Sequence, residues 1–251
     1  MRTVAIIPAA GSGKRMNRDV SKQYLTLAGK PILVCTLEVF EASPLVDALI
    51  VVVPSQDMES VRTDILAPWN LKKVAGIIPG GQERQDSVRA GIEALDADTE
   101  LVIIHDAVRP FITVGLIESC IRAAAAEGAV TVGVPVKDTI KEVGPDGRIL
   151  RTCDRSLLWL TQTPQVFRRD IIERAHRAAV RDGFRGTDDT ALVERLGITV
   201  RMIRGDYGNI KITTPEDLLA AEALLAALQQ ATGSRLQTTG WKCPPLQSTD
   251  S

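Results

Sequence analysis

Small residues and basic residues follow the first apolar segment of the chain, where a loop could bind phosphate. The segment 3–8 (TVAIIP) has the composition of a buried strand. Directly after it come the small residues Ala9, Ala10, Gly11, Ser12 and Gly13. Three cations, Lys14, Arg15 and Lys22, lie within the next nine positions. Because backbone N–H groups of small residues can approach an anion closely and the cations can balance its charge, this segment indicates a loop for a nucleoside triphosphate.

Two common phosphate-binding loops do not match this segment. A Walker loop requires glycine where Pro8 stands and Ser or Thr where Arg15 stands. A dinucleotide-binding fingerprint requires a third glycine where Met16 stands. The structural alternative is an ordinary glycine-rich turn with solvated lysines, and the flanking cations favour the functional interpretation.

Length and composition predict one α/β domain without a membrane or nucleic-acid partner. The chain has 251 residues, is 45% hydrophobic and has a formal net charge of -1. Its four cysteines, Cys35, Cys120, Cys153 and Cys243, form no C-x-x-C pair, and with only two histidines a structural zinc is disfavoured. No signal peptide or apolar run of membrane-spanning length is visible, so we expect a soluble protein of a reducing cytoplasm.

Apolar and amphipathic segments alternate along the chain. Segments 48–54, 74–78, 101–105 and 129–136 have the composition of further strands. Helices are predicted at 31–41, 84–95, 114–127, 169–182 and 215–230. This alternation predicts a mainly parallel sheet covered by helices on both faces within a domain of residues 1–231, with ligands at the carboxyl ends of the strands.

Two segments depart from this alternation. Residues 137–160 contain the turn sequence Gly144-Pro145-Asp146-Gly147 between polar strands, which predicts a β-hairpin arm. Since the arm has too little apolar surface to be stable alone, we expect it to exchange with the arm of a second subunit in a homodimer. The polar, proline-containing tail 232–251 is expected to be flexible.

Three later segments place chemistry-bearing residues after strands. Gly81 and Ser87 follow one strand and could contact a base edge, although a plain Gly-Gly turn is the structural alternative. Asp106 and Arg109 follow another and could hold Mg²⁺, a ribose hydroxyl or a phosphate, or simply pair within a turn. A single histidine such as His105 is more often a packed residue than a general base. Lys211, between Ile210 and Ile212, is expected on one face of a strand, in a cleft or in water.

Five ordered motifs spanning about residues 3–225 together resemble the 2-C-methyl-D-erythritol 4-phosphate cytidylyltransferases. The motifs are Ala9-Ala10-Gly11-x-Gly13-x-Arg15-Met16 with Lys22-Gln23-Tyr24, Gly80-Gly81-x-x-Arg84-x-x-Ser87, His105-Asp106-Ala107-x-Arg109-Pro110, Thr163-Pro164-Gln165 and Asn209-Ile210-Lys211. The resemblance implies a three-layer α/β/α, Rossmann-like nucleotidyltransferase fold with a protruding arm. It also implies an enzyme of non-mevalonate isoprenoid synthesis that uses CTP, a polyol phosphate and Mg²⁺ and releases pyrophosphate.

The resemblance also implies a role for each matching residue. The triphosphate is assigned to Ala9, Ala10, Gly11 and Gly13, and the catalytic cations are Arg15, Lys22 and Lys211. Cytosine is assigned to Gly81 and Ser87, the ribose to Asp106 and Ala107, and Mg²⁺ to Asp106. The second substrate is assigned to Arg109, Thr163 and Thr187, with Thr139 and Arg155 from the partner subunit.

The sequence departs from the family pattern at three positions. Ser21, Val108 and Gly208 stand where proline, alanine and aspartate are expected. The last departure concerns a region that can supply a metal ligand in related enzymes, which leaves Asp106 as the candidate. Two alternatives remain open at this point: a ribitol 5-phosphate cytidylyltransferase, and a nucleotide-binding module without turnover.

Overall fold

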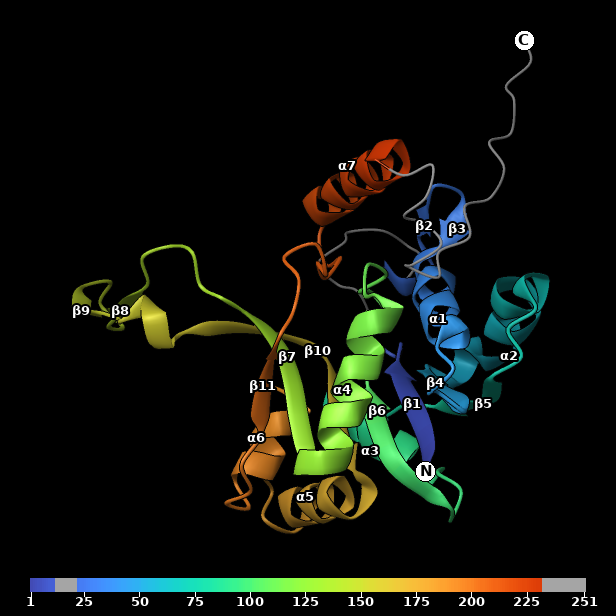
Figure 1. The fold of residues 1–251 in the computed structure, drawn as a ribbon, viewed down its shortest axis with the longest axis horizontal. Helices are drawn as coiled ribbons and strands as arrows, with labels where there is room; N and C mark the ends of the chain where they lie inside the picture. Colours follow the sequence, from blue (N-terminus) through green and yellow to red (C-terminus); the bar gives the residue numbers. More distant parts are fainter. Residues whose placement is uncertain (12–21, 232–251) are drawn as a thin grey trace.

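A mainly parallel sheet forms the centre of the computed structural model, which describes residues 1–11 and 22–231 (Figure 1). In this part of the chain seven strands form the main sheet, in the order β11-β7-β10-β6-β1-β4-β5. The strands are β1 (Arg2–Pro8), β4 (Ala48–Val53), β5 (Val74–Pro79), β6 (Thr99–Ile104), β7 (Ala129–Pro135), β10 (Trp159–Arg168) and β11 (Arg201–Arg204). Of these, β10 runs antiparallel to both of its neighbours, β6 and β7.

Both faces of the sheet are buried because its central strands are apolar at nearly every position. In β1, Ala5 and Ile7 pack into one hydrophobic cluster and Val4 and Ile6 into another, as the two-residue period of a strand requires. Helices α1 (Ile32–Ala42) and α4 (Val114–Glu127) cover the first face. Helices α3 (Arg84–Glu93), α5 (Arg169–Arg181) and α6 (Asp189–Glu194) cover the second. The predicted three-layer α/β/α fold is therefore confirmed.

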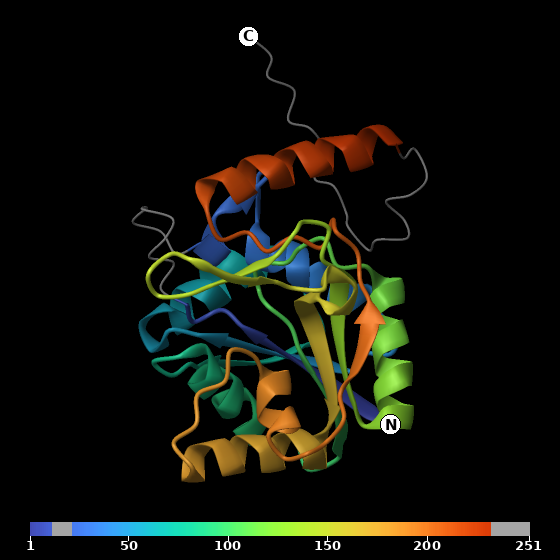
Figure 2. The same cartoon turned by 90° about the vertical axis from the view of Figure 1, so that its left-hand side faces the viewer.

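The remaining elements lie at the edges of the sheet. The short segment from β4 to β5 contains α2 (Met58–Ser60), the π-helical turn Val61–Leu66 and two 3-10 turns, Ser55–Asp57 and Ala67–Trp69. The two-residue strands β2 (Thr26–Leu27) and β3 (Lys30–Pro31) precede α1. Helix α7 (Pro215–Ala231) lies across the end of the molecule near β2 (Figure 2). No helix in the described ranges is both long and apolar enough to cross a bilayer.

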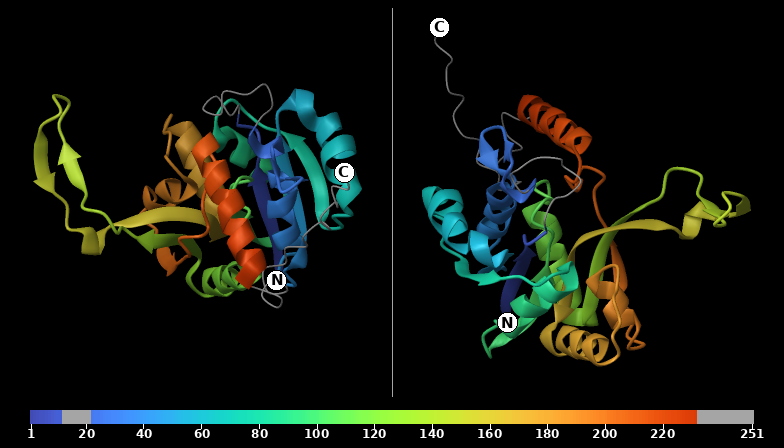
Figure 3. Two further views of the ribbon diagram at one scale, coloured as in Figure 1. Left: turned by 90° about the horizontal axis from the view of Figure 1, so that it is seen from above. Right: turned by 180° about the vertical axis from the view of Figure 1, so that it is seen from behind.

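The predicted arm is a two-stranded hairpin that extends far from the three layers (Figure 3). Its strands are β8 (Lys141–Val143) and β9 (Ile149–Thr152), followed by the 3-10 turn Arg155–Leu157. Apolar side chains on it are exposed, with Leu157 at 78% and Leu150 at 64%. A hairpin of this size is at best marginally stable by itself, so we expect its apolar side chains to pack against another protein surface.

Three elements and one residue differ from the sequence-based expectation. The strands β10 and β11 and the short helix α6 were not predicted. Lys211 does not lie on a strand, because residues 209–213 follow β11 as a loop. The alternation of Ile210 and Ile212 instead reflects anchoring of this loop, since Ile212 is fully buried and its backbone N–H donates to the carbonyl oxygen of Val108, at 2.9 Å.

Candidate active site

A cavity of about 350 Å³ opens at the carboxyl ends of β1, β5 and β6. The sequence-predicted residues that line it are Ala9, Ala10, Gly11, Gly81, Ser87, Asp106, Ala107 and Lys211. They come from four separate loops and, for Ser87, from the first turn of α3, all of which lie at one edge of the sheet. The structure therefore brings together the residues that were predicted to contact the nucleotide and that lie within the described ranges.

The beginning of the first loop is fixed by its neighbours. The backbone N–H of Ala9 donates to the carbonyl oxygen of Val52 in β4, at 2.7 Å. The carbonyl oxygen of Ala9 accepts from Nε2 of Gln23, at 2.6 Å, and Gln23 is 1% exposed. Gln23 belongs to the 3-10 helix Lys22–Tyr24, so the two halves of the first motif meet at Ala9. Gly13 and Arg15 lie outside the described residues, as does the side chain of Lys22.

The second loop packs directly on the first. A Cβ atom on Gly80 would lie 2.5 Å from Cβ of Ala10 and 2.8 Å from Oγ of Ser87, so only glycine allows this approach. The backbone N–H of Gly81 donates to Oγ of Ser87, at 3.2 Å, and that hydroxyl donates to the carbonyl oxygen of Glu83. Ser87 is thus a fixed polar group at the first turn of α3, buried beside the cavity.

Asp106 places a negative charge at the floor of the cavity and is surrounded by cations. Its Oδ1 lies 3.2 Å from Nε of Arg84, and its Oδ2 lies 2.8 Å from Nζ of Lys211 and 3.5 Å from Nε of Arg109. Burial alone would raise the pKa of Asp106, but the charges of these three side chains outweigh burial and lower it. The carboxylate is therefore ionised at neutral pH.

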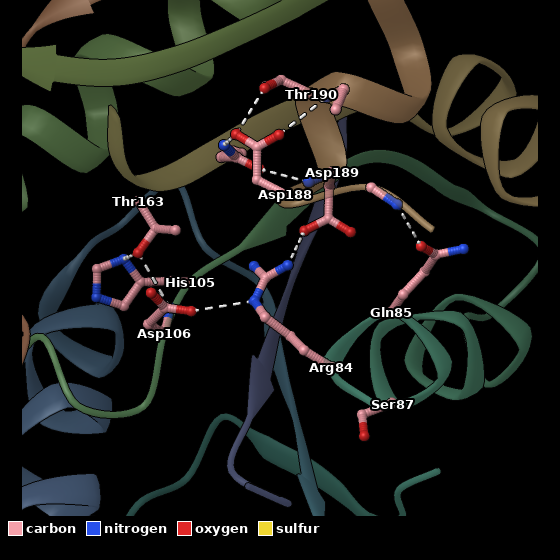
Figure 4. A network of polar contacts seen from close by, with 12 residues as sticks. Arg84, Gln85, Ser87, His105, Asp106, Thr163, Asp188, Asp189 and Thr190 are labelled. Atoms are coloured by element: carbon pink, nitrogen blue, oxygen red, sulfur yellow. Dashed lines mark hydrogen bonds and ion pairs between the residues drawn. The ribbon is translucent and has the colours of Figure 1, made fainter. Parts of the chain in front are cut away.

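Arg84 extends this cluster into the protein, away from the cavity. Its Nη1 donates to Oδ2 of Asp189, at 2.7 Å, so the guanidinium lies between two carboxylates (Figure 4). Asp189 is 1% exposed, and its Oδ1 accepts from Nε2 of His176, at 3.2 Å. Burial lowers the pKa of Arg84, but Asp189 and Asp106 together raise it above its ordinary value. The ion pairs therefore hold a permanent positive charge at the edge of the cavity.

His105 does not face the cavity. It is fully buried, its Nε2 lies 3.1 Å from the carbonyl oxygen of Arg109, and its Nδ1 lies 3.1 Å from Oγ1 of Thr163. Since a carbonyl oxygen only accepts, Nε2 carries the proton and Nδ1 accepts from Thr163. Burial lowers the pKa of His105 to about 4, so the ring is neutral at pH 7. His105 is the packed residue that the structural alternative predicted.

None of the five residues assigned to the second substrate lines the cavity. Thr163 is buried behind Asp106 and accepts from its backbone N–H, at 3.1 Å. Arg109 is directed inward, with Nη1 donating to the carbonyl oxygen of Asn209, at 2.7 Å. Thr187 lines a neighbouring depression that shares Arg84 with the cavity. Thr139 and Arg155 lie on the arm, and Nη1 of Arg155 donates to the carbonyl oxygen of Lys137 within the same arm.

Sequence reasoning did not assign roles to several residues of this site. Gln23, Arg84 and Asn209 were quoted within motifs only, although each contacts an assigned residue in the structure. In the sequence, Asp189 is only the second of two adjacent aspartates, and nothing there indicates its ion pair with Arg84. Its neighbour Asp188 is the N-cap of α6, accepting from the backbone N–H of Ala191, and the sequence alone does not distinguish the cap from the ion-paired residue.

The described residues are compatible with Mg²⁺ but do not form a complete site for it. Among residues 1–11 and 22–231, no cluster of three or more His, Cys, Asp or Glu side chains could hold a metal ion. The candidate ligand Asp106 has a cationic partner on each carboxylate oxygen. Mg²⁺ commonly binds through substrate phosphates, several waters and only one or two carboxylates. Besides Asp106, only Glu83 brings a carboxylate to the described lining of the cavity, so this pattern is satisfied only if the nucleotide supplies the other ligands.

Comparison with known proteins gives a consistent result. A sequence model of the 2-C-methyl-D-erythritol 4-phosphate cytidylyltransferase family matches residues 3–227. The 2-C-methyl-D-erythritol 4-phosphate cytidylyltransferase of Syntrophus aciditrophicus is 50% identical over 224 residues, which cover 89% of this chain and 96% of that protein. The protein of the same name from Geotalea uraniireducens is 50% identical over 230 residues, covering 91% and 98%.

A solved structure agrees with the sequence relatives. The crystal structure of 4-diphosphocytidyl-2C-methyl-D-erythritol synthase from Anaerococcus prevotii superposes with a TM-score of 0.80 at 34% identity, covering 90% of this chain and 96% of that one. The five motifs, the cavity they line and these similarities lead to one conclusion: the chain belongs to the 2-C-methyl-D-erythritol 4-phosphate cytidylyltransferase family.

Proposed function

We propose that the cavity at the carboxyl ends of β1, β5 and β6 binds CTP and that the chain transfers its cytidylyl group there. The acceptor is 2-C-methyl-D-erythritol 4-phosphate, and the products are 4-diphosphocytidyl-2-C-methyl-D-erythritol and pyrophosphate. The observation that carries this proposal is the convergence of two small-residue loops and the charged cluster of Asp106, Arg84 and Lys211 on one cavity. Family membership supplies the identity of both substrates.

The reaction needs cations more than it needs a base. The phosphate of the acceptor is already anionic at neutral pH, so it can attack the α-phosphate of CTP without losing a proton first. Two anions must meet, and negative charge accumulates on the α-phosphate as pyrophosphate leaves. Fixed cations stabilise this transition state, and we assign that role to Lys211 together with Arg15 and Lys22. The neutral, buried His105 agrees with chemistry that uses no histidine base.

The nucleotide contacts follow from the loops that line the cavity. Ala9, Ala10 and Gly11 line the cavity and have small side chains or none, so their backbone can approach the triphosphate closely. Gly81 and Ser87 present polar atoms at the start of α3, where the cytosine edge would be recognised. Asp106 is a permanent acceptor beside Ala107, where a ribose hydroxyl could donate.

Mg²⁺ would enter this cavity together with the triphosphate, with Asp106 as its candidate protein ligand. When bound, the ion would neutralise part of the charge on the phosphates. Titrating Mg²⁺ into the wild-type chain and an Asp106→Asn variant at saturating CTP separates the contribution of Asp106 to Mg²⁺ binding from that of the triphosphate. A protein ligand predicts a weaker apparent affinity for Mg²⁺ in the variant.

We also propose that the arm completes the active site of a second subunit. Its exposed apolar side chains, Leu157 and Leu150 among them, would be covered in a homodimer. In that arrangement Thr139 and Arg155 would reach the acceptor phosphate in the partner's site. The same pairing would explain why neither residue approaches the cavity of its own chain. A cytoplasmic location remains a prediction from the sequence.

Subunit complementation tests the shared site. Lys211→Met and Arg155→Met chains, each nearly inactive alone, are unfolded and refolded together so that subunits mix. Random pairing would restore about a quarter of wild-type activity, because half of the dimers would contain one intact site of two. Absence of any recovery in mixed dimers, or a monomeric mass in solution, would contradict the shared site.

A direct assay separates the candidate functions. The purified chain is incubated with CTP, Mg²⁺ and either methylerythritol phosphate or ribitol 5-phosphate, and pyrophosphate is measured. We expect release with the first acceptor at a much higher kcat/KM than with the second. Release mainly with ribitol phosphate would make the chain a ribitol 5-phosphate cytidylyltransferase, and CTP binding without turnover would favour a non-catalytic module.

A further inference from the structure

Asp189 is a buried carboxylate that lies outside the cavity but contacts a side chain that lines it. Arg84 donates from Nη1 to Oδ2 of Asp189, at 2.7 Å, and from Nε to Oδ1 of Asp106, at 3.2 Å (Figure 4). Arg84 itself lines the cavity. One guanidinium therefore links a carboxylate in the interior to the carboxylate at the cavity floor.

Asp189 is held in place from two further directions. Its Oδ1 accepts from Nε2 of His176 in α5, at 3.2 Å. Its backbone N–H donates to Oε1 of Gln165 in β10, at 3.1 Å. Because its carboxylate and its backbone are both fixed, Asp189 cannot follow Arg84 toward the cavity. It acts as an immobile anchor for the guanidinium.

The charges around Asp106 are divided between its two oxygens. Arg84 contacts Oδ1, whereas Lys211 contacts Oδ2 at 2.8 Å. Two carboxylates, Asp106 and Asp189, face three cations, Arg84, Arg109 and Lys211, so the cluster has one positive charge in excess. Of these cations Lys211 has the most exposed side chain, at 37%, against 11% for Arg109.

Lys211 can therefore leave Asp106 only while another cation stays on that carboxylate. A buried carboxylate that loses counter-charge is strongly disfavoured. Without Arg84 on Oδ1, only Arg109 would remain beside Lys211, at the longer distance of 3.5 Å and with its Nη1 bound to Asn209, so the attraction of Asp106 would hold Lys211 back. With Arg84 fixed by Asp189, Lys211 can turn toward an anion in the cavity at little cost.

We infer that Asp189 is a positioning residue of the active site: it holds Arg84 on Asp106 and thereby releases Lys211 to the α-phosphate of the bound nucleotide. This inference rests on the proposed function, which gives Lys211 that phosphate. Asp189 does not line the cavity, so its effect passes through Arg84 and Asp106. The inference predicts that the contribution of Asp189 to turnover disappears when Lys211 is absent.

A double-mutant cycle of Asp189→Asn and Lys211→Met tests this coupling. Asparagine keeps the size of the side chain and an acceptor for Arg84 or His176, which limits damage to the fold. We expect Asp189→Asn alone to lower kcat at least roughly tenfold, as small displacements of catalytic groups do. In the Lys211→Met background the same change should alter kcat by less than roughly twofold, whereas a purely structural role predicts that the two losses multiply.

Asp182→Asn is the matched control. Asp182 also binds two arginines, Arg181 and Arg195, at 2.8 Å each, and neither lines the cavity. Its loss should leave kcat unchanged in both backgrounds. If thermal unfolding shows that Asp189→Asn does not fold, Arg84→Met replaces it in the cycle, because Asp189 then keeps His176 as its partner. In whichever cycle has folded variants, losses of kcat that multiply would overturn the inference.

Failure of the inference and failure of the proposed function give different results. If the wild-type chain releases no pyrophosphate with either polyol phosphate, the proposed reaction is wrong, and the same cycle is read from the dissociation constant for CTP. Non-additive effects on that constant would still support the coupling, and additive effects would reject it. A wild-type chain that binds no CTP would overturn both proposals.

Discussion

Replacing Lys211 by methionine removes the most exposed cation of the charged cluster while keeping most of the volume of the side chain. Asp106 retains Arg84 and Arg109 after the change, so no buried carboxylate loses all its counter-charges. The ion pair that disappears includes a side chain that is 37% exposed, and such screened pairs contribute about 1 kcal/mol or less to stability. We therefore expect Lys211→Met to fold with nearly wild-type stability.

The expected loss of activity is much larger than the loss of stability. Removing one preorganised donor from a developing oxyanion costs roughly 2.7–4 kcal/mol in activation free energy. Lys211 is partly solvated and must first leave Asp106, so we subtract about 1 kcal/mol for that exposed pair. The remaining roughly 2–3 kcal/mol correspond to a fall in kcat of about 30- to 150-fold.

Pyrophosphate release at saturating CTP and methylerythritol phosphate measures this change, and urea unfolding measures the stability. Lys72→Met is the control, because Lys72 is an exposed lysine that does not line the cavity. A kcat within about fivefold of the wild type would refute the role given to Lys211, since this is less than about 1 kcal/mol. A large loss of stability would refute the description of the charged cluster.

Three further predictions concern the floor and the loops of the cavity. Asp106→Asn should lower the free energy of unfolding at pH 7 by about 3–5 kcal/mol, because the buried Arg109 and the partly buried Arg84 and Lys211 lose their partner. Since folding lowers the pKa of Asp106, the wild type should be more stable than the variant by the full amount above the unfolded pKa of about 3.9, and by less as urea unfolding is followed to lower pH. A stability difference that grows on acidification would contradict this. Gly80→Ala should push the two loops apart, lower the stability by about 1–3 kcal/mol and raise the dissociation constant for CTP measured by calorimetry. Gly115→Ala is the control, because its Cβ would meet no atom within 4 Å, and equal behaviour of the two variants would be inconsistent with loop contact. Arg15→Ala and Lys22→Ala should fold normally and lose at least roughly 10²-fold in turnover, and full activity of either variant would reject its assignment.

The parallel part of the fold could be predicted because each strand and helix there carries its own local signal. Continuous apolar runs gave β1, β4, β5, β6 and β7, and helical spacing gave α1, α3, α4, α5 and α7, with ends displaced by a few residues at most. The strand β10 was not predicted, because its first residues, Trp159 to Thr161, are exposed at the base of the arm and do not form the continuous apolar run of a buried strand. Only the pairing with β7 and β6, far away in the sequence, makes the segment a strand.

The site was predictable where residues follow strands and not where they meet across the fold. Gly81, Ser87 and Asp106 follow predicted strands, so their convergence could be expected from the topology. The bridge from Asp189 to Arg84 joins residues 105 positions apart, and a single sequence contains no signal for such a pair. All the role assignments remain predictions, and for Arg15, Lys22, Thr139 and Arg155 the structure does not show the side chain at the cavity either.

The strand β10 joins the arm to the interior without an intervening loop. Trp159 and Leu160 at its start pair with Pro135 and Val134, and Gln165 further along pairs with both Thr131 and Ile104. An inserted or deleted residue at the root of the arm would turn every following side chain to the opposite face and move Thr163 away from Asp106. Insertions and deletions during evolution should therefore be confined to the tip near Gly144 and Gly147, where a change in loop length does not alter the position of Thr163 beside Asp106.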